Sequence, residues 1–181
     1  DKVGNNPHAA GQMFDTTGNA LLDKFGQPAV AETPDANSLL QIAGAPATGA
    51  GGKPLSLVTH YEYDWVLSDG SVSSAAPMPM GMTLTTIDQN TKDGKLTAVN
   101  QRPIGFAGVF GLNTPCAGSQ TPWNTHLGSE ENYDADARTI EEGTNTALAS
   151  FDSFYFKQTG AAKPYNYGIL PELTVAADGS T

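Results

Sequence analysis

The only cysteine of the chain lies close in sequence to other side chains that can bind a metal ion. Cys116 is followed by His126 and by the adjacent carboxylates Glu130 and Glu131. Thiolate, imidazole and carboxylate groups are the usual protein ligands of transition metals, and a lone cysteine cannot form an internal disulfide. This window therefore indicates a metal site. A buried apolar cysteine and a solvated pair of glutamates are the structural alternative.

Two further polar side chains lie two positions apart in the most strand-like segment. Residues 55–65 are rich in β-branched and aromatic side chains, which predicts a β-strand. His60 and Glu62 then share one face of that strand, because side chains alternate between faces. This spacing suits joint binding of a metal ion or a hydrogen bond between imidazole and carboxylate. A polar strand edge would give the same pattern.

The elements that must position these side chains are short and separated by loops. Further short strands are predicted at residues 39–42, 81–87, 95–99 and 165–175. An Asp-Gly pair predicts a hairpin turn at 88–94, whereas the Pro-Asp-Ala-Asn run in 33–38 has the chemistry of a turn. The best helical pattern covers 135–156, with Gly143 as a candidate break. Residues 1–20 are polar and predict a weakly ordered lead-in.

The composition predicts a mostly β, loop-rich fold in a single domain. The 181 residues include 20 glycines and 12 prolines, which favours turns and short strands over long helices. The net charge of −10, with Arg102 and Arg138 as the only arginines, leaves no basic patch for nucleic acid or for an anionic membrane surface. The acidic residues serve solubility or supply oxygen ligands for Ca²⁺. No run of ~20 apolar residues is present, so no transmembrane segment is predicted.

Residues 116–132 resemble the signature segment of the PhoX-type alkaline phosphatases, a family of secreted bacterial enzymes. The cysteine, the Thr-Pro-Trp run and the Glu-Glu-Asn run of this segment keep the family's spacing without a gap. Residues 60–63 (His-Tyr-Glu-Tyr) and 164–172 resemble two other segments of the family, in the same order along the chain. The chain departs from the family pattern at Ser119, Asn124 and Ser129.

The resemblance implies both a fold and a set of metal ligands. The chain would be the N-terminal portion of a larger β-propeller, with a helical insertion at 135–156. Cys116 would bind Fe³⁺ through its thiolate. Glu130, Glu131 and Glu62 would also bind metal, with Ca²⁺ as the natural partner of carboxylate oxygens.

The resemblance also implies roles for residues that surround the metal ions. Asn132 would take a catalytic role by donating a hydrogen bond from its amide to a phosphate oxygen. The residues themselves, apart from the resemblance, suggest that His60 orients the neighbouring ligands and that Trp123 is a packing aromatic that pins the loop. His126 occupies a position that varies in the family, so the resemblance assigns it no role.

The expected function is that of part of an extracytoplasmic phosphomonoesterase that uses iron and calcium. Its substrate would be a phosphate ester, and the remainder of the same protein would supply the other ligands, so these 181 residues alone are expected to be inactive. The expected location is the periplasm, the medium or the cell surface, with a signal peptide already removed. The alternative is a catalytically inactive, calcium-binding propeller that self-assembles at the cell surface as an S-layer or filament.

Overall fold

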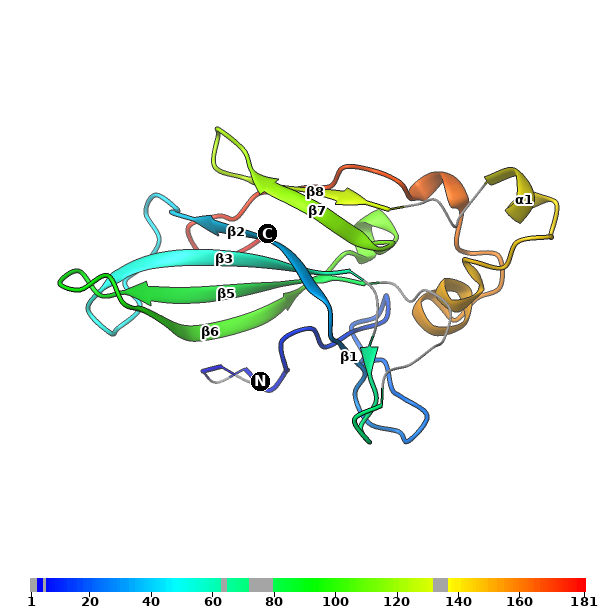
Figure 1. Cartoon of the computed structure of the whole chain (residues 1–181), viewed down its shortest axis with the longest axis horizontal. Coiled ribbons are helices and arrows are strands. Elements are labelled where there is room, and N and C mark those ends of the chain that lie inside the picture. The colour runs from blue at the N-terminus through cyan, green and yellow to red at the C-terminus, as the bar shows by residue number, and fades with distance from the viewer. Residues whose placement is uncertain (1–2, 5, 63–64, 72–79, 132–136) are drawn as a thin grey trace.

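An antiparallel sheet of four strands forms the centre of the molecule (Figure 1). Its strands, in spatial order, are β2 (Pro34–Leu40), β3 (Lys53–Tyr61), β5 (Met82–Gln89) and β6 (Leu96–Ile104). The structure is a computed structural model, and it describes residues 3–4, 6–62, 65–71, 80–131 and 137–181. The hairpin predicted between β5 and β6 is confirmed, since Gly94 N–H donates to the carbonyl oxygen of Asn90 at 2.9 Å.

The first strand of this sheet begins earlier than its sequence predicts. The run at 33–38 has turn chemistry, yet β2 starts at Pro34 and pairs with β3 from Asn37 to Leu40 in regular antiparallel register. Pairing with a long neighbouring strand outweighs the weak local preference for a turn. The turn preference survives as a shift in register between Pro34 and Asn37.

A second, smaller sheet covers the β2–β3 side of the first. It contains β7 (Pro115–Gln120), β8 (His126–Glu130) and β9 (Glu172–Leu173), and β7 lies against β2. The main core joins both sheets and contains Leu40, Val58, Met82, Leu84, Ile104, Leu112, Leu173 and Val175. Burying each large apolar side chain stabilises the fold by about 1.5–3 kcal/mol, so this core holds the two sheets together.

Two consecutive turns of one design organise the N-terminal segment. In each turn an aspartate, Asp15 or Asp23, accepts hydrogen bonds at Oδ1 from the backbone N–H groups two and four residues later, at 2.8 or 2.9 Å. A glycine with positive φ follows three residues after each aspartate. Because Met13 is buried beside the first turn, the later part of the expected lead-in at 1–20 is packed.

A small sheet and a second core complete this end of the molecule. β1 (Val30–Ala31) pairs with β4 (Trp65–Val66) in antiparallel register. The buried residues that pack together here are Met13, Leu21, Ala29, Ala31, Tyr61, Leu67 and Met80. Tyr61 ends β3, so this second core adjoins the central sheet.

The helices are short and interrupted. α1 (Ala137–Glu141) and the π-helix η2 (Phe151–Phe156) both fall in the predicted helical insertion, and Gly143 lies between them with φ of 74°. The insertion is therefore not one continuous helix. Two 3₁₀ turns, η1 (Ala107–Val109) and η3 (Pro164–Asn166), are the remaining helical pieces of the described chain. The 3₁₀ turn and Pro171 restrict the strand predicted at 165–175 to the two residues of β9.

The prediction of a mostly β fold is confirmed. That the chain forms part of a β-propeller stays a prediction. All pairings among the described strands are antiparallel, and the sheets that they form are open, with no closed barrel or propeller detected within the described residues. Over the same residues, none of the helices has the length and apolar character needed to cross a membrane.

Candidate metal centre

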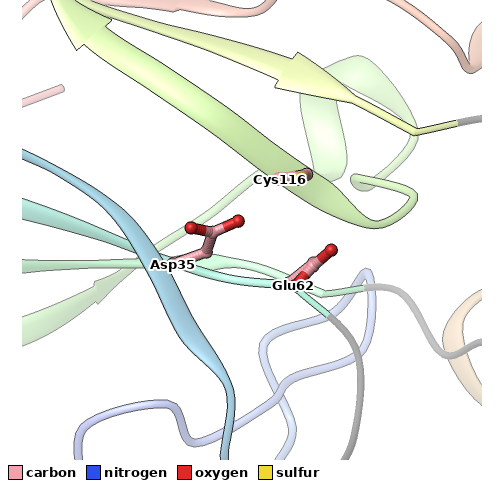
Figure 2. Close-up of side chains that lie close together, drawn as sticks. All are labelled: Asp35, Glu62 and Cys116. Carbon is pink, nitrogen blue, oxygen red and sulfur yellow. The ribbon is translucent and has the colours of Figure 1, made fainter.

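Three potential metal ligands from three separate segments meet where β2, β3 and β7 come together (Figure 2). Asp35 lies on β2, Glu62 directly follows β3, and Cys116 lies on β7. One ligand atom from each, a carboxylate oxygen or the Sγ atom, lies within 4.8 Å of the other two. Asp35 is exposed, whereas Glu62 and Cys116 are half-buried. This is the one such group of three His, Cys, Asp or Glu residues within the described chain.

Irregular strand pairing aims two of the three side chains at the site. The register of β2 against β3 shifts between Pro34 and Asn37, and Asp35 lies in that shift. The register of β7 against β8 shifts between Pro115 and Gly118, and Cys116 lies in that one. A β-bulge rotates a side chain away from the regular alternation, and bulges are frequent beside functional sites.

Glu62 reaches the site because it is tied to the start of β2. Its backbone N–H donates to the carbonyl oxygen of Thr33 at 2.9 Å, one step beyond the regular pairing of β3 with β2. The carboxylate of Glu62 therefore projects from the end of β3 beside Asp35, as Figure 2 shows. Two carboxylates held together in this way repel each other unless a proton or a cation lies between them.

The thiol of Cys116 carries the proton of the cluster in the absence of a cation. Burial, together with hydrogen bonds to the carboxylates of Asp35 and Glu62 and their negative charge, raises the pKa of Cys116 to about 12. At neutral pH the S–H group therefore donates to the carboxylates. A bound cation reverses this balance, because it attracts all three groups and deprotonates a coordinating thiol.

The donor chemistry fits a transition metal better than Ca²⁺. One sulfur and two carboxylate oxygens form a mixed soft and hard set that suits iron, zinc or cobalt. Calcium takes six to eight oxygen ligands and has little affinity for thiolate. Three protein ligands also leave coordination positions for water or for substrate.

Glu130, one of the predicted metal ligands, has its carboxylate engaged by the backbone. The side chain is buried, and its oxygens accept from the N–H groups of Asn113 at 2.7 Å, Gly168 at 2.8 Å and Ile169 at 3.2 Å. Burial raises the pKa of Glu130, and these three bonds oppose the rise. The carboxylate thus fastens the segments before β7 and before β9 to the end of β8.

The remaining predicted site residues occupy different surroundings. Glu131 is half-buried, is outside the three-residue cluster, and its N–H donates to Thr114 O at 2.9 Å. Trp123 is 67% exposed, and its Nε1 donates to Glu172 Oε1 at 2.5 Å. Its side chain is therefore mostly at the surface, where it joins the β7–β8 turn to β9 through this hydrogen bond. Asn132, the predicted catalytic residue, lies outside the described residues.

His60 is the most deeply placed of the predicted residues, and its partner is not Glu62. His60 and His126 are both fully buried, and their rings meet edge to face with a centroid distance of 4.4 Å. The two Nε2 atoms are hydrogen-bonded to each other, and His126 Nδ1 is bonded to Ser38 Oγ at 2.7 Å. Burial lowers the pKa of both imidazoles, that of His126 to about 4, so the pair is neutral at pH 7.

Sequence reasoning found Cys116 and Glu62 and missed Asp35. The Pro-Asp-Ala-Asn context of Asp35 indicates a turn, and no local pattern links this residue to a cysteine 81 positions later. The link arises from pairing of β2 with β3 and from packing of β7 against β2.

Comparison of the chain with models of protein families, with curated proteins and with solved structures found no match. The likeness to PhoX-type phosphatases therefore rests on the three sequence segments alone.

Proposed function

We propose that Asp35, Glu62 and Cys116 bind a transition-metal ion, and that this ion is iron in a PhoX-like phosphomonoesterase of which the chain is a part. The observation that supports the proposal is the convergence of three donor atoms within 4.8 Å from three separate segments. The cysteine of this cluster is the cysteine of the signature-like segment. The cluster and the signature-like segment therefore share Cys116, the only cysteine of the chain.

The negative charge of the chain favours a metal centre for this substrate class. The net charge of the chain is −10, so a phosphate ester is repelled by the protein's own field unless cations offset it. A metal ion, when bound, supplies positive charge to the phosphate oxygens in an in-line transition state. In the proposal, the two carboxylates and the thiolate fix that charge, and Asn132 donates a hydrogen bond to a phosphate oxygen.

The remainder of the same protein completes the site in this proposal. Three ligands do not make a multi-metal centre, and the predicted Ca²⁺ ions need more oxygen ligands than the cluster offers. We assign those ligands to the rest of a β-propeller, and we place the protein outside the cytoplasm. Both assignments rest on the resemblance.

The test is made on the full-length protein, purified without chelators, by elemental analysis and by release of phosphate from p-nitrophenyl phosphate. The proposal expects stoichiometric iron, calcium and phosphatase activity, with iron and activity both lost in Cys116→Ser. The matched control is Asp93→Asn, a carboxylate in the exposed β5–β6 turn whose Oδ1 accepts from Lys95 N–H at 3.0 Å. That variant is expected to keep both iron and activity.

Two outcomes would contradict the proposal in different ways. If the protein contains iron but releases no phosphate, the proposed reaction is rejected and the proposed metal centre is retained. Calcium without iron, in a protein that forms ordered arrays or filaments, would instead favour the structural reading of the propeller and would make Cys116 a packing residue.

A further inference from the structure

A buried network of polar side chains connects β2 and β3 through β8, which pairs with the cysteine-bearing strand β7. It runs from Ser38 on β2 to His126 on β8 and on to His60 on β3. All three side chains are buried. Hydrogen bonds in such a dry setting are electrostatically stronger and more directional than at the surface.

At His60, the hydrogen-bonded network lies beside the backbone of the segment that carries Cys116. Backbone groups of Pro115 and Cys116 lie near the imidazole of His60. Within the described residues, His60 Nδ1 is also the one buried side-chain polar atom without a hydrogen bond. Buried polar atoms are rarely left unpaired, so this nitrogen is an exception among the described residues.

Two glycines bring the imidazole pair and the second sheet close together. Gly118 on β7 and Gly128 on β8 are register partners. A Cβ on Gly118 would lie 3.0 Å from His60 Cε1, and one on Gly128 would lie 2.8 Å from the same atom. The absence of both side chains lets β7 and β8 lie directly on His60, which fixes the separation of the two sheets at this point.

The spacing along the strands connects this contact to the metal ligands. Ser38 is three residues from Asp35 on β2, and His60 is two residues before Glu62, which places each about 7–10 Å from its ligand at ~3.3 Å per residue. Gly118 is two residues after Cys116. The network therefore includes a residue of β2 and a residue of β3 within three positions of the ligand on that segment, and on β7 the backbone of Gly118, two positions after Cys116, lies against His60.

We infer that Ser38, His126 and His60 are positioning residues that hold β2, β3 and β7 at the separation at which Asp35, Glu62 and Cys116 can bind one metal ion. The inference rests on the proposed metal centre and assigns a role to His126, for which the sequence resemblance gave none. Metal sites tolerate only ~0.2 Å of error in ligand distance, so a small displacement of β7 is enough to weaken binding.

The test is titration of the purified, metal-free full-length protein with Co²⁺, followed by the thiolate-to-cobalt charge-transfer band. Ser38→Ala removes one hydroxyl and frees His126 to turn. We expect Co²⁺ affinity to fall by about tenfold or more, as for loss of other groups that orient metal ligands, together with a shifted or weakened band. His126→Gln serves as a second variant, and circular dichroism establishes that each variant folds.

The control is Thr121→Val in the same β7–β8 hairpin. The Thr121 hydroxyl is also buried and hydrogen-bonded, to Thr125 Oγ1 at 2.7 Å, but it lies at the opposite end of β7 from Cys116. This variant is expected to bind Co²⁺ with unchanged affinity and spectrum. Wild-type affinity and an unaltered band in folded Ser38→Ala would overturn the positioning role alone, as would an equal loss in Thr121→Val. Absence of any thiolate band in the wild type would overturn the metal centre and the positioning role with it.

Discussion

The sharpest structural prediction concerns a single methyl group added at Gly128. The Cβ of Gly128→Ala would lie 2.8 Å from His60 Cε1, 3.2 Å from His60 Nε2 and 3.3 Å from Pro171 Cγ. The backbone of Gly128 is not in the left-handed region, so the conformation itself accepts alanine. The imidazole cannot withdraw freely, because it is fully buried and bonded to His126. The added methyl must therefore displace β8 from β3.

The expected cost is that of overpacking a well-filled interior, about 1–3 kcal/mol in the free energy of unfolding. Urea denaturation followed by fluorescence measures it as a lower midpoint at an unchanged slope. Gly105→Ala is the matched control, because its Cβ would meet nothing within 4 Å and its φ is not positive. That substitution is expected to be neutral or to stabilise the protein by about 0.4–1 kcal/mol, because alanine lowers the conformational entropy of the unfolded chain.

A Gly128→Ala variant as stable as the wild type would refute the close contact between β8 and the imidazole pair. Equal destabilisation by Gly128→Ala and Gly105→Ala would assign the effect to the backbone instead of the contact. Either result would also remove the steric basis for the positioning role of His60.

Two further predictions address the buried imidazole and the core. Burial lowers the pKa of His126 from 6.5 to about 4. As the pH falls from 6.5 towards 4, the imidazole takes up a proton in the unfolded chain but not in the folded protein, so the free energy of unfolding falls over this range. Between pH 7 and pH 5, where most carboxylates stay ionised, we expect the free energy of unfolding to drop by about 2 kcal/mol, and a flat profile in urea titrations would contradict the buried neutral pair. In β2, Leu40→Ala is expected to cost about 2–5 kcal/mol because Leu40 is 0% exposed, whereas Leu39→Ala, at 41% exposure, is expected to change stability by less than about 1 kcal/mol. Equal thermal unfolding of these two variants would reject the orientation of β2.

The central sheet could be predicted from sequence because its signals are local. Apolar and polar residues alternate along β5, and an Asp-Gly pair marks the turn to β6. The small second sheet was harder to predict, because β9 has two residues and the β7–β8 segment is rich in glycine and polar side chains. The segment that carries Cys116 forms β7, which pairing with β8 stabilises.

The candidate site was only half predictable, because its geometry is made by contacts between distant segments. Residue type identified Cys116 and Glu62 as potential ligands. Residue type could not show that backbone N–H groups far along the chain engage the carboxylate of Glu130. Nor could it reveal Asp35, which a bulge in β2 brings beside the cysteine. The buried contact of His60 with His126 likewise depends on two facing glycines in different strands.

The central claim is that one metal ion is bound by a thiolate and two carboxylates at the meeting point of β2, β3 and β7. X-ray absorption spectroscopy at the edge of the metal in the full-length protein tests it most directly. The account predicts one sulfur neighbour at roughly 2.3 Å, the length of a metal–thiolate bond, with oxygen or nitrogen as the other ligands. It predicts that Cys116→Ser removes the sulfur neighbour and that Asp35→Asn weakens metal binding. A metal ion surrounded only by oxygen and nitrogen in the wild type would contradict the account.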